Sequence, residues 1–154
     1  SELYGINTIG VRFFSVFGEW GRPDMIFFKI IKAVKEKNTF FLNNHGNHYR
    51  DFTYIQDVIK ILIKLKNLNL KKEKNAVFNI CSNKPYKILT VVNFIKKELK
   101  KKPLIKMRKF QVGDIYKTHG SNKKLKNYIN IKFTNFYPAL IKTIKWNKKY
   151  LNLD

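Results

Sequence analysis

The sequence has too little of several residue types to support some large classes of protein. It holds one cysteine, Cys81, which excludes an internal disulfide and a cysteine-based metal site. It has no run of about 18 apolar residues, so no membrane-spanning helix is predicted. The first four residues show neither a basic start nor an apolar segment, so no signal peptide is predicted. We therefore expect a cytoplasmic protein whose 154 residues form one domain with a modest core.

Acidic residues are also scarce, and the chain carries a net charge of +22. Such a charge is typical of surfaces that bind nucleic acid. However, four of the 32 basic residues are arginines, which leaves 28 lysines, and these accompany abundant Asn, Ile, Phe and Tyr, the residues of AT-rich codons. The lysines gather in residues 60–74 and 96–102, where we predict solvated helix faces and loops. Base composition thus explains the charge, and a nucleic-acid partner is not expected.

The four arginines are informative because this chain otherwise uses lysine. An arginine indicates a position that needs a flat donor able to make two parallel hydrogen bonds. Arg12 and Arg22 lie in RFFSVFGEWGRPDM (residues 12–25), Arg50 opens RDFTYIQD, and the fourth is Arg108. A guanidinium on a loop stiffened by glycine and proline suits a ligand that carries phosphate or carboxylate.

The hydrophobic pattern alternates strands with helices. We predict strands over residues 8–14, 39–42 and 76–81, and helices over residues 25–36, 55–66, 89–99 and 139–150. Asp24 is predicted to cap the first helix, and Ser121 a short helix that extends to residue 126. A polar turn follows the strand 39–42. This order of elements predicts an α/β fold.

Five motifs, in order and at compatible spacings, resemble one family. They are similar to its RFFTVYGPWGRPDM, RDFTYIDD, YNIGNS, QPGD and terminal W…Y segments. In this chain they read RFFSVFGEWGRPDM (12–25), RDFTY (50–54), FNICSN (78–83), QVGD (111–114) and WNKKY (146–150). The family is that of the NAD-dependent nucleotide-sugar epimerases and dehydratases, extended short-chain dehydrogenase/reductases, and the resemblance is greatest to the UDP-glucuronate 4-epimerases.

The resemblance implies the fold and the extent of the domain. We expect the last part of a Rossmann-type parallel sheet followed by a small C-terminal substrate-binding domain. Residues 1–154 then correspond to the C-terminal portion of such an enzyme, with the N-terminal dinucleotide-binding half absent or encoded separately. Without the preceding strands, the strand 8–14 is expected to expose an apolar edge, which makes the chain alone poorly soluble.

The resemblance also implies how a UDP-sugar is bound at its phosphates and sugar. Arg50 corresponds to the arginine that binds the pyrophosphate, although it could instead pair with a neighbouring aspartate. Arg22 and Lys29 fall near the sugar and phosphates, and Lys29 could equally be a solvated lysine. Ser15 stands where relatives carry Thr or Asn, and its hydroxyl could donate to the sugar carboxylate or to a phosphate oxygen.

Four further positions correspond to the nucleoside and to substrate choice. Phe41 and Asn43 align with the strand that contacts uracil, where relatives usually have an aromatic residue in place of Asn43. Asp114 resembles the acid that accepts hydrogen bonds from the ribose. Gln111 replaces an arginine of the galactose and N-acetylhexosamine types, which favours the glucuronate type. Glu19 replaces a proline, so a looser opening loop is expected.

NAD is the cofactor that the resemblance implies. Phe13 and Phe14 fall where the family's strand passes the nicotinamide ring, with core packing as the alternative. In the family, a tyrosine of a Tyr-x-x-x-Lys pair takes the C4 hydroxyl proton while NAD takes the hydride. This chain has no GxGxxG turn. Its one Tyr-x-x-x-Lys match, Tyr128 and Lys132, comes after the substrate motifs, and about one such match is expected by chance in a chain so rich in lysine. We therefore assign no catalytic residue, and the three histidines lack metal-ligand spacing.

Two hypotheses remain open. In the first, the chain is the UDP-sugar-binding half of an enzyme that epimerises C4 of UDP-glucuronate and UDP-galacturonate through a 4-keto sugar, with NAD held mainly by the other half. In the second, it is a non-catalytic remnant or a basic interaction module that binds nucleic acid or another acidic partner.

Overall fold

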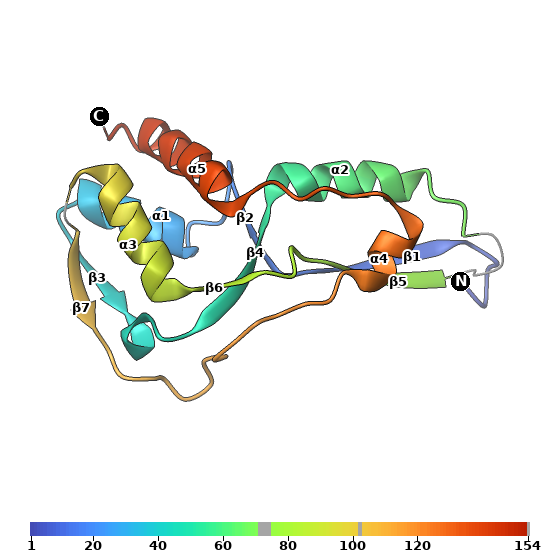
Figure 1. The fold of residues 1–154 in the computed structure, drawn as a ribbon, viewed down its shortest axis with the longest axis horizontal. Coiled ribbons are helices and arrows are strands. Elements are labelled where there is room, and N and C mark those ends of the chain that lie inside the picture. The colour runs from blue at the N-terminus through green and yellow to red at the C-terminus, as the bar shows by residue number, and fades with distance from the viewer. Residues whose placement is uncertain (71–74, 102, 154) are drawn as a thin grey trace.

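The computed structural model describes residues 1–70, 75–101 and 103–153 and confirms the α/β class. Figure 1 shows an elongated molecule with helices and strands gathered at two ends and joined through a central group of strands around β4. One end holds β1 (Thr8–Phe13), β5 (Asn75–Ile80), α2 (Ile55–Lys66) and α4 (Lys123–Tyr128). The other end holds α1 (Ile26–Lys35), β3 (Thr39–Leu42), α3 (Ile88–Leu99), β7 (Leu104–Met107) and α5 (Phe136–Tyr150). Between them lie β2 (Ser15–Phe17), β4 (Tyr49–Tyr54) and β6 (Pro85–Lys87).

The first strand changes its partner at Phe14. Before this residue β1 pairs with β5 in parallel, and after it β2 pairs with β4 in parallel, with Ser15 opposite Phe52. The amide of Val16 donates to the Phe14 carbonyl at 2.8 Å, which marks the break. The strand predicted over residues 8–14 is confirmed as β1, which ends one residue earlier, and β2 follows as a separate short strand. β4 also pairs antiparallel with β6, while β3 and β7 form a separate parallel pair.

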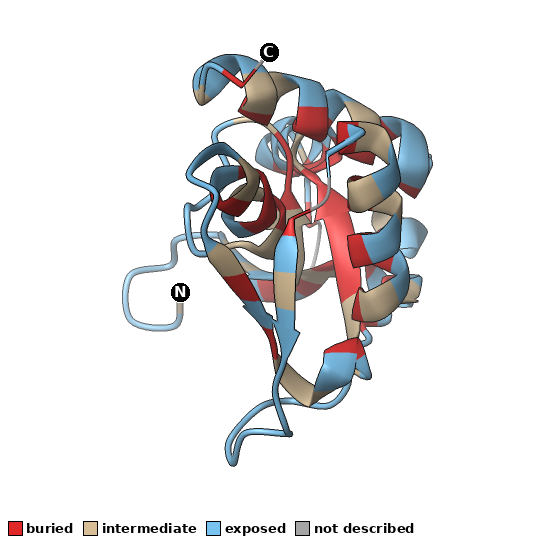
Figure 2. Ribbon diagram, turned by 90° about the vertical axis from the view of Figure 1, so that its left-hand side faces the viewer, coloured by how far each residue is buried: buried red, intermediate tan, exposed pale blue. Residues whose placement is uncertain are grey.

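Two hydrophobic clusters form the core. The larger joins α1, α3 and α5 to β2, β3 and β4, and Ile30, Val91 and Leu140 are fully buried in it. The smaller lies under α2 and α4, around Phe78 of β5. Figure 2 shows the buried positions on the inner faces of the helices and on the central strand, and the outer helix faces exposed. Each helix thus buries one apolar stripe, as its 3.6-residue period predicts.

A buried carboxylate fastens two distant segments to β4. The side chain of Asp51 is fully buried and accepts hydrogen bonds from the Ser82 amide at 3.1 Å, the Ser82 hydroxyl at 2.8 Å and the Gly120 amide at 3.1 Å. The amide of Asp51 donates to Thr118 Oγ1 at 3.1 Å. The segments after β5 and before α4 are therefore both held at one point of β4.

One predicted helix cap is wrong, and the other lies one residue before the N-cap position. Met25, not Asp24, is the N-cap of α1, because the Asp24 carboxylate accepts hydrogen bonds from Arg22. Asn122 is the N-cap of α4 and makes no capping hydrogen bond through its side chain, whereas the hydroxyl of the predicted cap, Ser121, accepts a hydrogen bond from the Lys123 amide at 3.5 Å. By contrast, the predicted helix over residues 55–66 is confirmed to the residue as α2.

The expected apolar edge is present at β1. Among the described residues β1 pairs only with β5, so its second edge has no strand partner. Ile59 and Ile63 of α2 are also exposed large apolar side chains. Of the lysine-rich stretches, residues 71–74 and 102 lie outside the described residues. In the part of the chain that the structure describes, no helix is both long and apolar enough to cross a membrane.

We expect Asp51→Asn to lower the free energy of unfolding by about 3 kcal/mol, or to abolish the cooperative transition. The new amide group would face buried N–H and O–H donors, which would lose a charged acceptor. Urea unfolding followed by circular dichroism measures the change. Asp24→Asn, at an exposed ion pair, is the control and should lower the free energy of unfolding much less. A change at Asp51 no larger than that of the control would contradict the structural role.

Candidate functional site

A groove of about 450 Å³ lies between α1 and the outer face of β3. The alternation of the strand buries Phe40 and Leu42 and leaves Phe41 exposed on the other face. Three predicted substrate residues line the groove: Lys29 of α1, Phe41 of β3 and Asn43 after it. Two further basic residues, Lys32 of α1 and Arg108 after β7, line it as well.

The QVGD segment contacts one residue of the groove lining, Asn43. The Asn43 side-chain amide donates to Gln111 Oε1 at 2.7 Å and lies 3.4 Å from Asp114 Oδ2. Gln111 and Asp114 are the ends of a tight turn in which the Asp114 amide donates to the Gln111 carbonyl at 3.0 Å. Gly113 has φ +95° at the third position, which is typical of a type II turn and favours glycine. The structure thus brings Asn43 into contact with two predicted residues of the distant QVGD motif.

Arg50 is fixed beside the same segment. Its Nη1 donates to the Tyr49 carbonyl at 2.8 Å and to the Ile115 carbonyl at 2.6 Å. The alternative pairing with an aspartate is wrong, because Asp51 and Asp57 accept hydrogen bonds from other groups. The Nε and Nη2 donors of Arg50 have no hydrogen-bond partner among the described residues, so they remain available to a ligand.

The electrostatics at this position favour an anion. Burial lowers the pKa of Arg50, and Asp114 acts in the opposite direction. Burial also lowers the pKa of His48, with Arg50 adding to the shift and Asp114 opposing it. Two cationic or potentially cationic groups therefore share one nearby carboxylate, and a second anion would stabilise them both.

Arg22 and Ser15 line neither the groove nor its contact with the QVGD segment. The Arg22 guanidinium is exposed and binds Asp24 through two hydrogen bonds, one of 2.9 Å from Nε to Oδ1. This pairing raises the pKa of Arg22 and lowers that of Asp24. Ser15 is half-buried on β2, opposite Phe52 of β4. The structure does not place Arg22 or Ser15 against Lys29 or Phe41.

The two phenylalanines predicted at the cofactor differ in their surroundings. Phe13 ends β1 and is exposed. Phe14 is half-buried, and a Cβ added at Gly120 would lie 2.5 Å from its ring and 2.6 Å from the Cys81 sulfur. Packing at Phe14 therefore demands glycine at position 120. Burial raises the pKa of the Cys81 thiol to about 11, which makes it a poor nucleophile.

The opening loop is tethered where a looser loop was expected. The Tyr54 hydroxyl donates to the Glu19 carboxylate at 2.9 Å, so the residue that replaces the proline anchors the loop to β4. Burial, with Glu19 as the next cause, raises the pKa of Tyr54 to about 12. Gly18 has φ +140°, and a Cβ there would lie 2.3 Å from Ile55, so only glycine fits.

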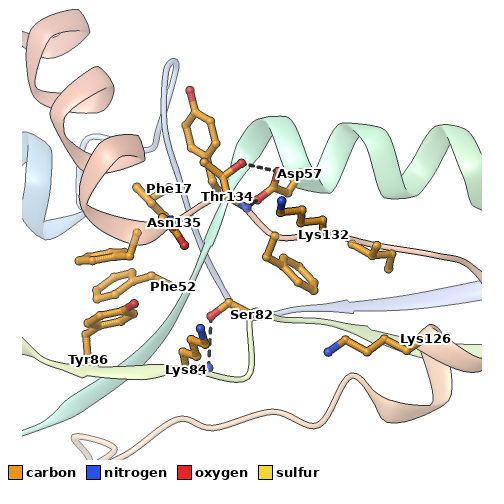
Figure 3. A pocket seen from close by; sticks show the side chains of 14 residues that line it. Phe17, Phe52, Asp57, Ser82, Lys84, Tyr86, Lys126, Lys132, Thr134 and Asn135 are labelled. Carbon is orange, nitrogen blue, oxygen red and sulfur yellow. Dashed lines mark hydrogen bonds between the residues drawn. The ribbon is translucent and has the colours of Figure 1, made fainter.

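Figure 3 shows a second pocket, of about 270 Å³, lined by Lys84, Lys126 and Lys132. None of the predicted substrate or cofactor residues lines it. Lys132 belongs to the Tyr-x-x-x-Lys match, but α4 ends at Tyr128, whose ring packs edge-on against Phe78. The two residues of the match are therefore not neighbours on one helix, as they would be in the catalytic arrangement.

Arg108 and His48 are residues of the site that the sequence did not assign. The guanidinium carbon of Arg108 lies 3.6 Å from the centre of the Phe41 ring. The scarcity of arginine was a signal for Arg108, whereas no pattern pointed to His48. In residues 1–70, 75–101 and 103–153, no group of three or more His, Cys, Asp or Glu side chains is placed to hold a metal ion.

Residues 1–81 match the family described as the NAD dependent epimerase/dehydratase family. Because the match covers more than half of the 154 residues, the chain belongs to this family. The fold that the motifs implied, with parallel strands of a Rossmann-type sheet, is thereby confirmed.

The chain is similar to several known proteins of about twice its length or more. An uncharacterised protein of Methanocaldococcus jannaschii is 38% identical over 132 residues, which are 85% of this chain and 39% of that protein. UDP-glucuronate 4-epimerase 4 of Arabidopsis thaliana is 33% identical, over 100% of this chain and 39% of its own length. The structure of a UDP-glucuronic acid 4-epimerase from Bacillus cereus, in complex with UDP-glucuronic acid and NAD, matches with a TM-score of 0.83 and 24% identity. That match covers 97% of this chain and 48% of the other.

We expect the stability of the protein to fall as the pH decreases below about 6.5, in part because of His48. The pKa of this histidine lies below its usual 6.5 in the folded chain, so the unfolded chain binds a proton more readily. Protonation therefore stabilises the unfolded state more than the folded state. The contribution of His48 to the free energy of unfolding is fully present above pH 6.5 and is lost as the pH falls through the lower pKa of the folded state. Urea unfolding between pH 5 and pH 8 should show a flatter profile for His48→Gln. An unchanged profile would contradict this assignment.

Proposed function

We propose that the chain is the UDP-sugar-binding half of an enzyme similar to UDP-glucuronate 4-epimerase, which inverts C4 through a 4-keto sugar. The observation that carries the proposal is the hydrogen-bonded meeting of Asn43 with Gln111 and Asp114, next to Arg50. Asn43 and Arg50 come from one region of the sequence, and Gln111 lies 68 residues beyond Asn43. Their convergence beside an open groove supports one ligand site.

Each part of a UDP-sugar finds suitable chemistry at this site. The unengaged donors of Arg50 suit the pyrophosphate oxygens, which a guanidinium binds in pairs. Lys29 lines the groove and adds positive charge. Asp114 has carboxylate oxygens for the ribose hydroxyls, and Phe41 adds an apolar side chain to the lining of the groove.

The sugar end is assigned to Arg22 and Ser15. The Arg22 fork already holds a carboxylate, that of Asp24, in a two-point arrangement. We propose that the carboxylate of a glucuronate or galacturonate replaces Asp24 there. Gln111, uncharged and bonded to Asn43, is consistent with a site that does not add a further cation.

NAD and the catalytic pair are assigned to polypeptide outside these 154 residues. When bound there, NAD would supply a reversible hydride acceptor for C4 of the sugar. Phe13 is exposed at the end of β1, where it can contact the cofactor. The unpaired edge of β1 and the exposed Ile59 and Ile63 of α2 offer an apolar surface to the cofactor-binding half. A sheet that continues across this edge would bury both.

We expect the chain to bind UDP-glucuronate saturably, and Arg50→Ala to weaken binding by about 10- to 100-fold. This range corresponds to the loss of charged hydrogen bonds worth about 1.5–3 kcal/mol. Calorimetric titration at physiological salt measures the affinity. Lys145→Ala, which removes an exposed charge from α5, is the matched control and should change the affinity less than twofold.

The same titrations test the alternative. Binding of RNA that weakens steeply with salt, together with no detectable UDP-sugar binding, would contradict the proposal and favour a basic interaction module.

A further inference from the structure

Arg108 has no role in the function proposed above, yet its position is well defined. It directly follows β7, and its amide donates to the Leu42 carbonyl at 2.9 Å, so the β3–β7 ladder continues to this residue. Lys106 lies opposite Phe41 in the register. Because side chains alternate along a strand, Lys106 and Arg108 share the outward face with Phe41.

The guanidinium of Arg108 lies on the ring of Phe41. Its central carbon is 3.6 Å from the ring centre, which is van der Waals distance. The side chain makes no hydrogen bond or ion pair with a described residue, although the chain contains ten carboxylates. Contact with the ring therefore holds one face of the guanidinium, and both residues line the groove.

The next outward residue of this strand cannot form a similar surface. Asn43 is bound through its amide to Gln111 and presents a small polar group. Lys29 and Lys32, on the α1 side of the groove, carry point charges on flexible stems. Arg108 stacked on Phe41 is thus the flat surface of this groove.

We propose that Arg108 and Phe41 together form a stacking platform for the pyrimidine base of a nucleoside diphosphate. The base lies on the face of the guanidinium opposite Phe41, and this assignment rests on the proposed function. Nucleobases stack on guanidinium planes as they do on aromatic rings. Arg50 binds the phosphates through the donors of its guanidinium that make no hydrogen bond with a described residue. Arg108 thus binds the base, and Arg50 binds the pyrophosphate.

The test compares UDP with ribose 5-diphosphate, which lacks the base, in calorimetric titrations of the 154-residue chain. The wild-type chain should bind UDP about tenfold or more tightly than ribose 5-diphosphate, as expected for one stacked base. Arg108→Lys keeps the charge but removes the plane, and should bring the ratio of the two affinities to about one. Arg108→Tyr removes the charge but keeps a plane, and should retain most of the ratio.

The outcomes separate this inference from the proposed function. If UDP binding depends on Arg50 but Arg108→Lys leaves the ratio unchanged, the platform is wrong and the proposed function stands. If Arg108→Tyr weakens both ligands equally, Arg108 binds phosphate, and the platform is again wrong. If the wild-type chain binds neither ligand, the proposed function and the platform both fail. Thermal unfolding of each variant shows whether the exposed substitutions leave the fold intact.

Discussion

The arrangement of the site depends on the buried carboxylate of Asp51. It accepts hydrogen bonds from Ser82, which precedes α3, and from Gly120, which follows β7. The two ends of the segment that contains α3 and β7 are therefore held at one point of β4. The segment that leads to Gly120 must therefore run along the start of β4. The Tyr49 amide donates to the Tyr116 carbonyl at 2.8 Å along this path. The same path brings Gln111 and Asp114 beside Asn43, so a structural aspartate determines the geometry of the binding residues.

The two fully buried aspartates satisfy backbone and hydroxyl donors, not cations. Asp57 accepts hydrogen bonds at 2.8 Å from both the amide and the hydroxyl of Thr134, much as Asp51 does from Ser82. Within the described residues the ion pairs are Arg22–Asp24 and Lys32–Glu36, both exposed. Neither Arg50 nor Arg108 forms an ion pair with a described carboxylate, and the chain has a net charge of +22. Positive charge that is not neutralised by ion pairs attracts an anionic ligand to the groove.

The sequence predicted the helices better than the strands, for a physical reason. The apolar stripe of α2 shows the full 3.6-residue period, so its ends could be located. β4 was missed because Asp51, Phe52, Thr53 and Tyr54 are all buried, which removes the alternation typical of a half-exposed strand. β6 and β7 are short, and their pairing is set by strands far away in the chain.

Motif resemblance located much of the candidate site, and the geometry explains what it missed. Asn43, Gln111 and Asp114 were predicted separately, and the structure joins them by hydrogen bonds. The contact of Arg108 with Phe41 links two strands whose pairing no local pattern reveals. At Asp24 the local sequence pattern misled instead. It predicted that the Asp24 carboxylate caps α1, but this carboxylate accepts a hydrogen bond from the nearby Arg22.

The two ends of the proposed ligand site differ in how far they are built before a ligand binds. At the nucleotide end, Arg50 is held by two carbonyls and Asn43 by the QVGD turn, so little side-chain freedom remains to be lost on binding. At the sugar end, Arg22 lies on an exposed loop and already holds Asp24. A ligand must displace that carboxylate, so part of its interaction energy is offset there. Most of the affinity should then come from the nucleoside diphosphate, while discrimination between sugars depends on the exchange at Arg22 and on the half of the site that other polypeptide supplies.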